Sequence, residues 1–200
     1  MTVSVLPGSD AEAAVWRTTL EVATLLTGLP WVLIGAQAII VVALEHGRRP
    51  TRATVDVDVI VDVRAIAGGA RDAAQRLVDA GFELSAEHAH RFVRDRDLVD
   101  LLVPDHLGPR TDLTTVPPRV TTEIPGGRRA LTLSHPVDVV VASVGAGTLV
   151  VPDLPALLVL KAWAWGGRRA ARDLEDLIRL VDIAPDAGAV RDILNRAVAP

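Results

Sequence analysis

The sequence predicts an α/β fold with a helical C-terminal part. Half of the 200 residues are hydrophobic and only 3% are aromatic, which suits a close-packed aliphatic core. Apolar runs with strand character alternate with amphipathic helical segments, and only helical segments follow Pro152. We expect one domain over residues 1–200, with an α/β core at about residues 10–151 and a helical part at residues 152–200.

Helices are expected where amphipathic segments lie between capping and breaking residues. The predicted helices cover residues 10–27, 37–46, 68–80, 152–165, 170–182 and 187–198. Ser9 or Asp10 caps the first, and Gly47 and Gly81 end the second and third. The pair at residues 166–167, two glycines, is expected to interrupt the helix that starts near Pro152.

Strands are expected at short apolar runs bounded by Gly or Pro and at segments that alternate with period two. The predicted strands cover residues 31–34, 53–63, 82–86, 90–93 and 98–103. The alternation is clearest in the second of these, where valines form one face and Asp56, Asp58, Ile60 and Asp62 form the other. The type of the short apolar pieces between residues 120 and 151 stays open.

Composition excludes several classes of protein. The absence of cysteine excludes a disulfide scaffold, thiol catalysis and cysteine-based zinc sites. The high hydrophobic content excludes disorder for most of the chain. A formal net charge of −4 argues against a protein that coats nucleic acid through general positive charge, although it leaves room for a local basic groove.

The stretch at residues 22–44 carries no charge and is long enough to span a bilayer. Gly28 and Pro30 break it near one end, and Gly35 breaks it again. We interpret it as the end of one helix, a buried strand, a glycine turn and a second helix. No signal peptide is expected, because no basic segment precedes an apolar one at the start. The prediction is a cytoplasmic protein without membrane contact.

Asp56 and Asp58 are the first chemical signal, because a strand places them side by side on one face. Aspartate is disfavoured in strands, and two like charges at this spacing repel each other. A divalent cation would offset this cost, since carboxylate oxygens suit Mg²⁺. A solvent-exposed strand face is the alternative interpretation, which Asp62 supports and Ile60 weakens.

Asp100 is the second signal, a single acid within an aliphatic strand. An unpaired buried carboxylate is costly, so this one needs a metal ion, a cation or strong hydrogen-bond donors. The alternatives are a strand end that reaches solvent, or a salt bridge to one of three arginines: Arg91, Arg94 and Arg96.

Gly35 and Ala36 form the turn between a predicted strand and a predicted helix. A small residue at such a turn lets a phosphate approach backbone N–H groups at the helix N-terminus. Taken alone, a glycine at this position equally serves the geometry of the chain.

The ordered set of these features resembles the nucleotidyltransferase superfamily. Residues 33–38 look like that family's glycine-containing turn, and residues 52–61 look like its metal-binding strand. In the C-terminal part, Lys161 followed by the segment Arg-Asp-Leu-Glu-Asp-Leu at residues 172–177 is similar to AbiEii/AbiGii-type nucleotidyltransferase toxins. The resemblance covers roughly residues 31–181 and implies a nucleotidyltransferase-like mixed β-sheet flanked by helices.

This resemblance implies transfer of a nucleoside monophosphate from an NTP to an acceptor hydroxyl. Two Mg²⁺ ions, with Mn²⁺ as a substitute, would be held by Asp56, Asp58 and Asp100, and Asp100 would also activate the acceptor. Lys161 would contact the NTP phosphates, unless it is a lysine that extends from a core helix to solvent. The other expected nucleotide-binding residues are Gly35, Ala36, Arg52, Thr54 and Asp173. Asp173 would act indirectly, by orienting Lys161 or Arg52. The alternative is that Asp173 only forms salt bridges on the helix surface.

The resemblance further implies a toxin that acts on tRNA, a protein side chain or a small molecule, together with an antitoxin partner. This chain departs from the family pattern at one position. The family turn usually reads Gly-Gly or Gly-Ser, whereas this chain has Ala36, which lacks the hydroxyl of serine and the conformational freedom of glycine. A non-catalytic nucleotide-binding module and an aminoglycoside-type nucleotidyltransferase therefore remain alternatives. An RNA-modifying enzyme should show a basic groove, whereas a small-molecule enzyme should show an acidic acceptor pocket.

Overall fold

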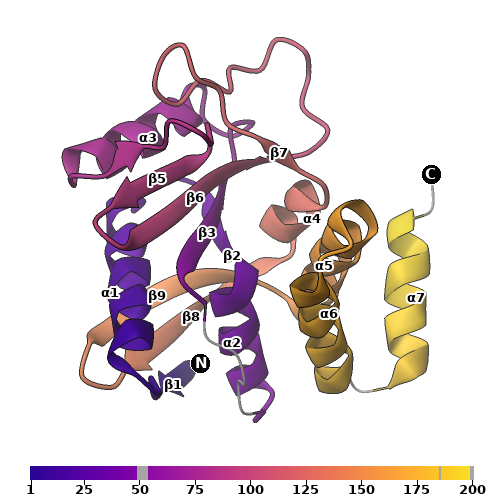
Figure 1. Ribbon diagram of the computed structural model, residues 1–200. Coiled ribbons are helices and arrows are strands. Elements are labelled where there is room, and N and C mark those ends of the chain that lie inside the picture. The colour runs from indigo at the N-terminus through magenta and orange to yellow at the C-terminus, as the bar shows by residue number, and fades with distance from the viewer. Residues whose placement is uncertain (49–53, 185, 199–200) are drawn as a thin grey trace.

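Two mixed β-sheets and seven helices make up the described part of the chain (Figure 1). This computed structural model describes residues 1–48, 54–184 and 186–198. Helices alternate with single strands or runs of strands up to β9 (Gly145–Pro152), after which only helices follow. The α/β class and the helical C-terminal part are confirmed.

The larger sheet has six strands and carries the predicted acids at its centre. Its strands are β2 (Trp31–Ile34), β3 (Asp56–Val61), β4 (Glu83–Leu84), β5 (Arg91–Arg94), β6 (Asp97–Pro104) and β7 (Glu123–Ile124). Their order is β2-β3-β6-β5-β4, with β7 paired to the end of β6. β3 and β6 run parallel, and their register places Asp58 opposite Asp100. On the other side of β3, antiparallel β2 pairs Ile34 with Asp58, so the turn that follows β2 lies next to the acids.

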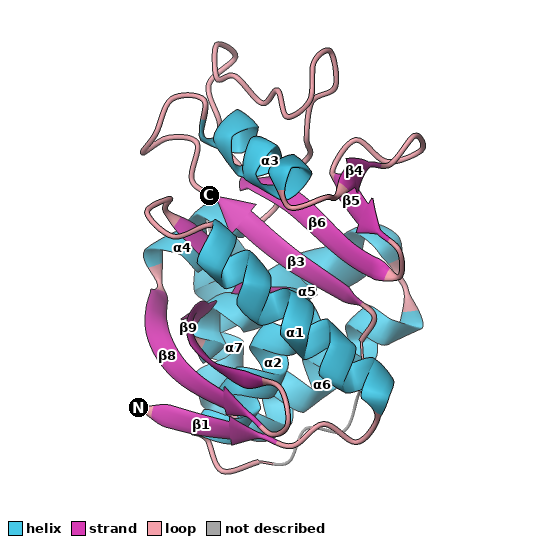
Figure 2. Cartoon of the chain, turned by 90° about the vertical axis from the view of Figure 1, so that its left-hand side faces the viewer, coloured by secondary structure: helices cyan, strands magenta, loops and turns pink. Residues whose placement is uncertain are grey.

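The smaller sheet has three strands and adjoins the larger one. It contains β1 (Thr2–Val5), β8 (Ser134–Val141) and β9 in the order β1-β8-β9, and β9 lies beside β2. Helix α1 (Asp10–Leu25) packs against strands of both sheets, as Figure 2 shows, and α3 (Gly69–Asp79) packs on the larger sheet. Apolar residues on one face of α1 and on both sheets thus form a continuous core.

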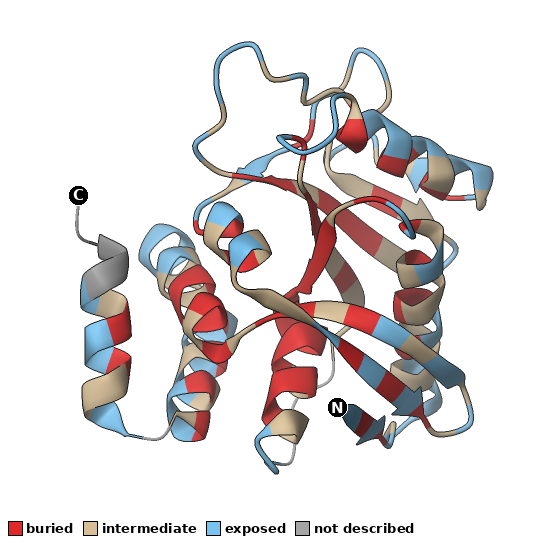
Figure 3. Ribbon diagram, turned by 180° about the vertical axis from the view of Figure 1, so that it is seen from behind, coloured by how far each residue is buried: buried red, intermediate tan, exposed pale blue. Residues whose placement is uncertain are grey.

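Helix α2 (Gly35–Glu45) is buried along most of its length (Figure 3). It follows β2 without a loop and packs against strands of both sheets and against α6 (Ala171–Ile183). This explains the uncharged stretch at residues 22–44, which forms the end of α1, strand β2 and α2. No described helix is long and apolar enough to cross a membrane.

The C-terminal helices pack on one another beside the core (Figure 1). They are α5 (Leu154–Arg168), α6 and α7 (Ala187–Val198), and α5 also packs against the short helix α4 (Gly127–Thr132). Asp153 caps α5, because its carboxylate accepts a hydrogen bond from the backbone N–H of Ala156. This capping fixes the start of the helix that carries Lys161.

Three details of the sequence prediction are wrong. Gly166 and Gly167 do not interrupt α5, which continues to Arg168; both glycines are exposed, and two glycines near a helix end cost only about 1 kcal/mol each. The second helix begins at Gly35 and not at residue 37. The strands form two sheets, because β8 and β9 pair with β1, a strand that the sequence pattern did not reveal.

Candidate active site

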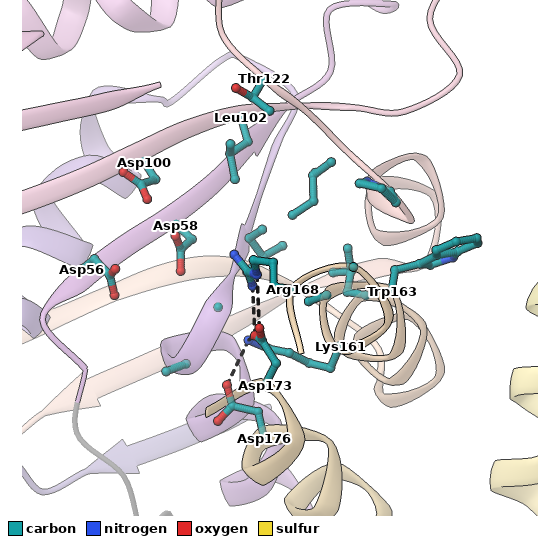
Figure 4. A pocket seen from close by; sticks show the side chains of 18 of the residues that line it. Asp56, Asp58, Asp100, Leu102, Thr122, Lys161, Trp163, Arg168, Asp173 and Asp176 are labelled. Carbon is teal, nitrogen blue, oxygen red and sulfur yellow. Dashed lines mark hydrogen bonds and ion pairs between the residues drawn. The ribbon is translucent and has the colours of Figure 1, made fainter. Parts of the chain in front are cut away.

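Three carboxylates meet where β3 and β6 run side by side. Asp56 and Asp58 project from β3, and Asp100 projects from β6 beside Asp58 (Figure 4). One oxygen of each lies within 4.8 Å of the others, and they are the group among the described residues that could hold a metal ion. The same face of β3 continues with Ile60, which is fully buried. The acids therefore lie at the edge of a buried face: Asp56 and Asp58 are half-buried, and Asp100 is buried, which excludes the solvent-exposed alternative for Asp100.

The carboxylate of Asp58 is the least compensated of the three. Although the residue as a whole is half-buried, the loss of hydration at its carboxylate raises its pKa, and the charges of Asp56 and Asp100 raise it further. Lys161 and Arg91 act in the opposite direction, and the net result is a pKa of about 7 instead of 3.8. Such a group favours a bound proton or a bound cation.

This raised pKa predicts a loss of stability with increasing pH in the metal-free protein. Between about pH 4 and pH 7 the unfolded Asp58 is ionised while the folded one keeps its proton, so the free energy of unfolding falls through this range and levels off above it. Asp58→Asn removes the effect. We expect urea unfolding in EDTA to show similar stabilities of the wild type and the variant near pH 4, and a variant more stable by about 4 kcal/mol near pH 8, since each pKa unit corresponds to about 1.4 kcal/mol. A difference that is the same at both pH values would contradict this assignment.

Gly35 is the residue that allows Asp58 to occupy its position. A Cβ atom at Gly35 would lie 2.0 Å from Oδ2 of Asp58, and the φ angle of +72° is one that residues with side chains rarely adopt. Gly35 and Ala36 form the first turn of α2 and line the same cleft as the acids. The turn between β2 and α2 therefore places the backbone of a helix N-terminus directly beside a carboxylate.

Asp100 is paired with Arg91, one of the three arginines proposed as its partners. Nε and Nη2 of Arg91 each donate a hydrogen bond of 2.7 Å to a separate oxygen of Asp100. Nη2 also lies 3.6 Å from Oδ2 of Asp56. The reason is register, since Arg91 on β5 is directly opposite Asp100 on β6. Arg94 instead pairs with Glu21 and Asp97.

Thr54 lies two residues before β3, and its side chain contacts an acid of that strand. Its hydroxyl donates a 2.7 Å hydrogen bond to Oδ1 of Asp56. The side chain lines the cleft, which is compatible with the predicted contact with a nucleotide. That contact stays a prediction. Arg52, the other residue predicted beside this strand, lies outside the described residues.

Lys161 faces the acids from the opposite wall, within a cluster of its own (Figure 4). Its Nζ lies 2.9 Å from Oδ2 of Asp176 and 3.7 Å from Oδ1 of Asp173. Arg168 donates two further hydrogen bonds to the carboxylate of Asp173. Asp173 and Asp176 are buried, so neither acid belongs to an exposed helix surface, and both carboxylates lie beside Lys161.

Substitution of Lys161 should destabilise the protein. Lys161→Met removes the buried cation that lies between the carboxylates of Asp173 and Asp176, which costs about 3 kcal/mol in comparable buried pairs. Asp173 keeps its ion pair with Arg168, and Arg179 stays 3.8 Å from Asp176. Arg168→Met is the matched control, because the Arg168 side chain is 59% exposed and Asp173 keeps Lys161 in that variant. We expect it to lose less than about 1 kcal/mol in urea unfolding. Equal losses would show that Lys161 does not neutralise this cluster.

The predicted residues that the structure describes converge on one cleft of about 550 Å³. They are Asp56, Asp58, Asp100, Lys161, Gly35, Ala36, Thr54 and Asp173. The cleft lies between the central strands of the larger sheet and helices α5 and α6. It therefore combines an acidic floor, formed by Asp56, Asp58 and Asp100 on the sheet, with Lys161 on the helical wall.

Other residues join this cleft through the pairing of distant elements. His90 lies 4.0 Å from Oδ2 of Asp100, and its ring is near that of His88. Trp163 is 48% exposed and lines the cleft. Arg91 was noted only as a salt-bridge partner. The pairing of β5 with β6 and the rotation of α5 place these side chains, and neither follows from local sequence.

The donor set fits a hard divalent cation. All three candidate ligands are carboxylates, the ligand type that Mg²⁺ and Mn²⁺ prefer, and their oxygens are close enough to share one ion. The raised pKa of Asp58 agrees with this assignment: burial of its carboxylate raises the pKa most, and the charges of Asp56 and Asp100 raise it further.

Comparison with protein families shows what kind of protein builds such a cleft. Residues 25–199 match the family model described as "Nucleotidyl transferase AbiEii toxin, Type IV TA system". The chain belongs to the AbiEii family. It is thus a nucleotidyltransferase of a toxin family, and the resemblance inferred from the sequence is confirmed.

A solved structure resembles this AbiEii protein across nearly its whole length. It is the crystal structure of an antigenic nucleotidyltransferase-like protein from Paracoccidioides brasiliensis, with a TM-score of 0.50 and 16% sequence identity. The match covers 95% of this chain and 88% of that chain. At this identity the similarity shows the fold alone, and it agrees with the predicted nucleotidyltransferase-like sheet. A comparison with curated proteins finds no match.

Proposed function

We propose that this AbiEii protein is a divalent-metal-dependent toxin that transfers a nucleoside monophosphate from an NTP to a hydroxyl of RNA, with tRNA as the expected class, in the cytoplasm. The observation that carries the proposal is the meeting of three carboxylates within 4.8 Å, in a cleft whose other wall presents Lys161. An antitoxin protein that binds this toxin would control this activity.

The roles of the residues follow from their positions. Asp56, Asp58 and Asp100 would hold Mg²⁺ or Mn²⁺, which would neutralise the charge on the phosphates and lower the pKa of the attacking hydroxyl. Lys161, oriented by Asp173 and Asp176, offers a positive charge to the phosphates from the facing wall.

The first turn of α2 offers a second phosphate contact. The backbone N–H groups of a helix N-terminus attract anions, and those of Gly35 and Ala36 are at the cleft. Ala36 lacks a hydroxyl, but backbone N–H groups make this contact without one. The departure from the usual family turn is therefore compatible with nucleotide binding, and nucleotide affinity measured with Ala36→Ser tests how much a hydroxyl adds.

The edge of the cleft favours a polyanionic acceptor. Arg168 and Arg172 are exposed and line the cleft where α5 meets α6. Arg172, and Arg168 beside its partner Asp173, would attract an RNA backbone at this edge, while the acids Asp56, Asp58 and Asp100 are assigned to the metal ion. The proposal therefore favours RNA over a small cationic acceptor.

The experiment that tests this proposal measures which molecule receives the label. The purified protein is incubated with each NTP labelled at its α-phosphate, with Mg²⁺ and with total RNA, beside an Asp58→Asn control. We expect label that is lost after RNase treatment and absent from the control. Label that survives RNase but is lost with protease would replace RNA by a protein acceptor, and no transfer under any condition would contradict the proposal.

A further inference from the structure

Arg91 occupies the side of the acidic cluster that a cation would otherwise fill. Its guanidinium contacts both oxygens of Asp100 at 2.7 Å, and the same Nη2 group lies 3.6 Å from Asp56. The positive charge thus lies between acids of two strands, in a cluster whose oxygens are within 4.8 Å of each other. A divalent ion bound to Asp56 and Asp100 would contact the same carboxylates as Nη2 and would place a second positive charge close to the guanidinium.

The position of Arg91 is not needed to hold its strand in place. β5 is already joined to β6 by four backbone register pairs, and Arg94 on the same strand supplies an ion pair with Glu21 and Asp97 away from the cleft. The Arg91 side chain is 28% exposed and lines the cleft. It can therefore leave the acids for the open side without disturbing the core.

We infer that Arg91 is a placeholder cation, which neutralises Asp100 and Asp56 in the metal-free protein and competes with the divalent ion for them. This inference rests on the proposed metal-dependent function and adds a property to it. Metal binding without nucleotide is weakened, because the incoming ion must displace a guanidinium that makes two short hydrogen bonds. An NTP offsets this competition, since its phosphates add ligands to the ion and accept the displaced guanidinium. The site is thus filled mainly when metal and nucleotide arrive together.

Mn²⁺ affinity of the metal-free protein tests this inference. We expect Arg91→Gln to bind Mn²⁺ about tenfold more tightly than the wild type without nucleotide, as measured by electron paramagnetic resonance, because one competing positive charge a few ångströms away is removed. Arg94→Gln is the matched control and should leave Mn²⁺ affinity unchanged. Arg91→Lys keeps the charge but not the two parallel hydrogen bonds, so its Mn²⁺ affinity should lie between those of the wild type and Arg91→Gln. It also tests the inference if the Gln variant does not fold.

A second measurement separates competition from a merely structural role. With a non-hydrolysable NTP present, the wild type and Arg91→Gln should differ less in Mn²⁺ affinity than they do without it. Unchanged or weaker Mn²⁺ binding by the folded Arg91 variants would overturn the inference while leaving the proposed function intact. Absence of Mn²⁺ binding in every protein, the wild type included, would contradict the metal site itself and this inference with it.

Discussion

Asp58→Asn is expected to reduce nucleotidyl transfer by about a thousandfold or more, because the substitution removes a charged ligand at the centre of the acidic cluster. Asp58 lies between the other two acids in the fold: two residues from Asp56 on β3 and opposite Asp100 on β6. Asparagine has the same shape but a weaker and neutral oxygen donor. Initial rates of label transfer at saturating Mg²⁺ give the measurement.

The matched control for this substitution is Asp62→Asn. Asp62 follows β3 on the same chain segment, but it forms an exposed ion pair with Arg64 and does not line the cleft. Its substitution should leave the rate within about twofold, since exposed ion pairs contribute little. A folded Asp58→Asn variant with nearly full activity would show that the acids are not the metal site.

Gly35→Ala is expected both to destabilise the protein and to remove activity. The new Cβ would lie 2.0 Å from Oδ2 of Asp58, so either this carboxylate or the first turn of α2 must move. Strain of the left-handed backbone costs about 1–2 kcal/mol, and the steric overlap adds to it. We expect the free energy of unfolding in urea to fall by about 3 kcal/mol or more. The rate of nucleotidyl transfer should fall at least as strongly as the affinity of the variant for the metal ion.

Gly28→Ala separates the strain of the backbone from the steric overlap with Asp58. Gly28 also has a left-handed φ of +84°, but nothing lies within 4 Å of the position where its Cβ would be built. Its substitution should show the backbone cost alone, about 1 kcal/mol, and normal transfer. If both variants lose the same stability and keep full activity, the close approach of Gly35 to Asp58 has no functional meaning.

The acidic floor of the cleft could be predicted because its signals are local. Alternation with period two placed Asp56 and Asp58 on one face, and their unfavourable proximity indicated a cation. Asp100 was conspicuous as an acid in an apolar strand. The uncharged stretch before β3 also separated into the correct elements, because glycine and proline divide it at residues that depend little on tertiary contacts.

The rest of the site depends on how distant elements pair. Three arginines were possible partners of Asp100, and only the register of β5 with β6 selects Arg91. The exposure of Trp163 depends on the rotation of α5 against its neighbours. Strand β1 is short and pairs with β8, more than a hundred residues further along the chain, so no local pattern reveals it.

Labelling the two ends of the triphosphate tests the central claim most directly. The purified protein, total RNA and Mg²⁺ are incubated with an NTP labelled either at the α-phosphate or at the γ-phosphate. If the acids of β3 and β6 support nucleotidyl transfer, α-label appears on the acceptor while γ-label is released as pyrophosphate, and both signals are lost in Asp58→Asn. Transfer of γ-label to the acceptor, or α-label transfer that survives Asp58→Asn, would contradict the account.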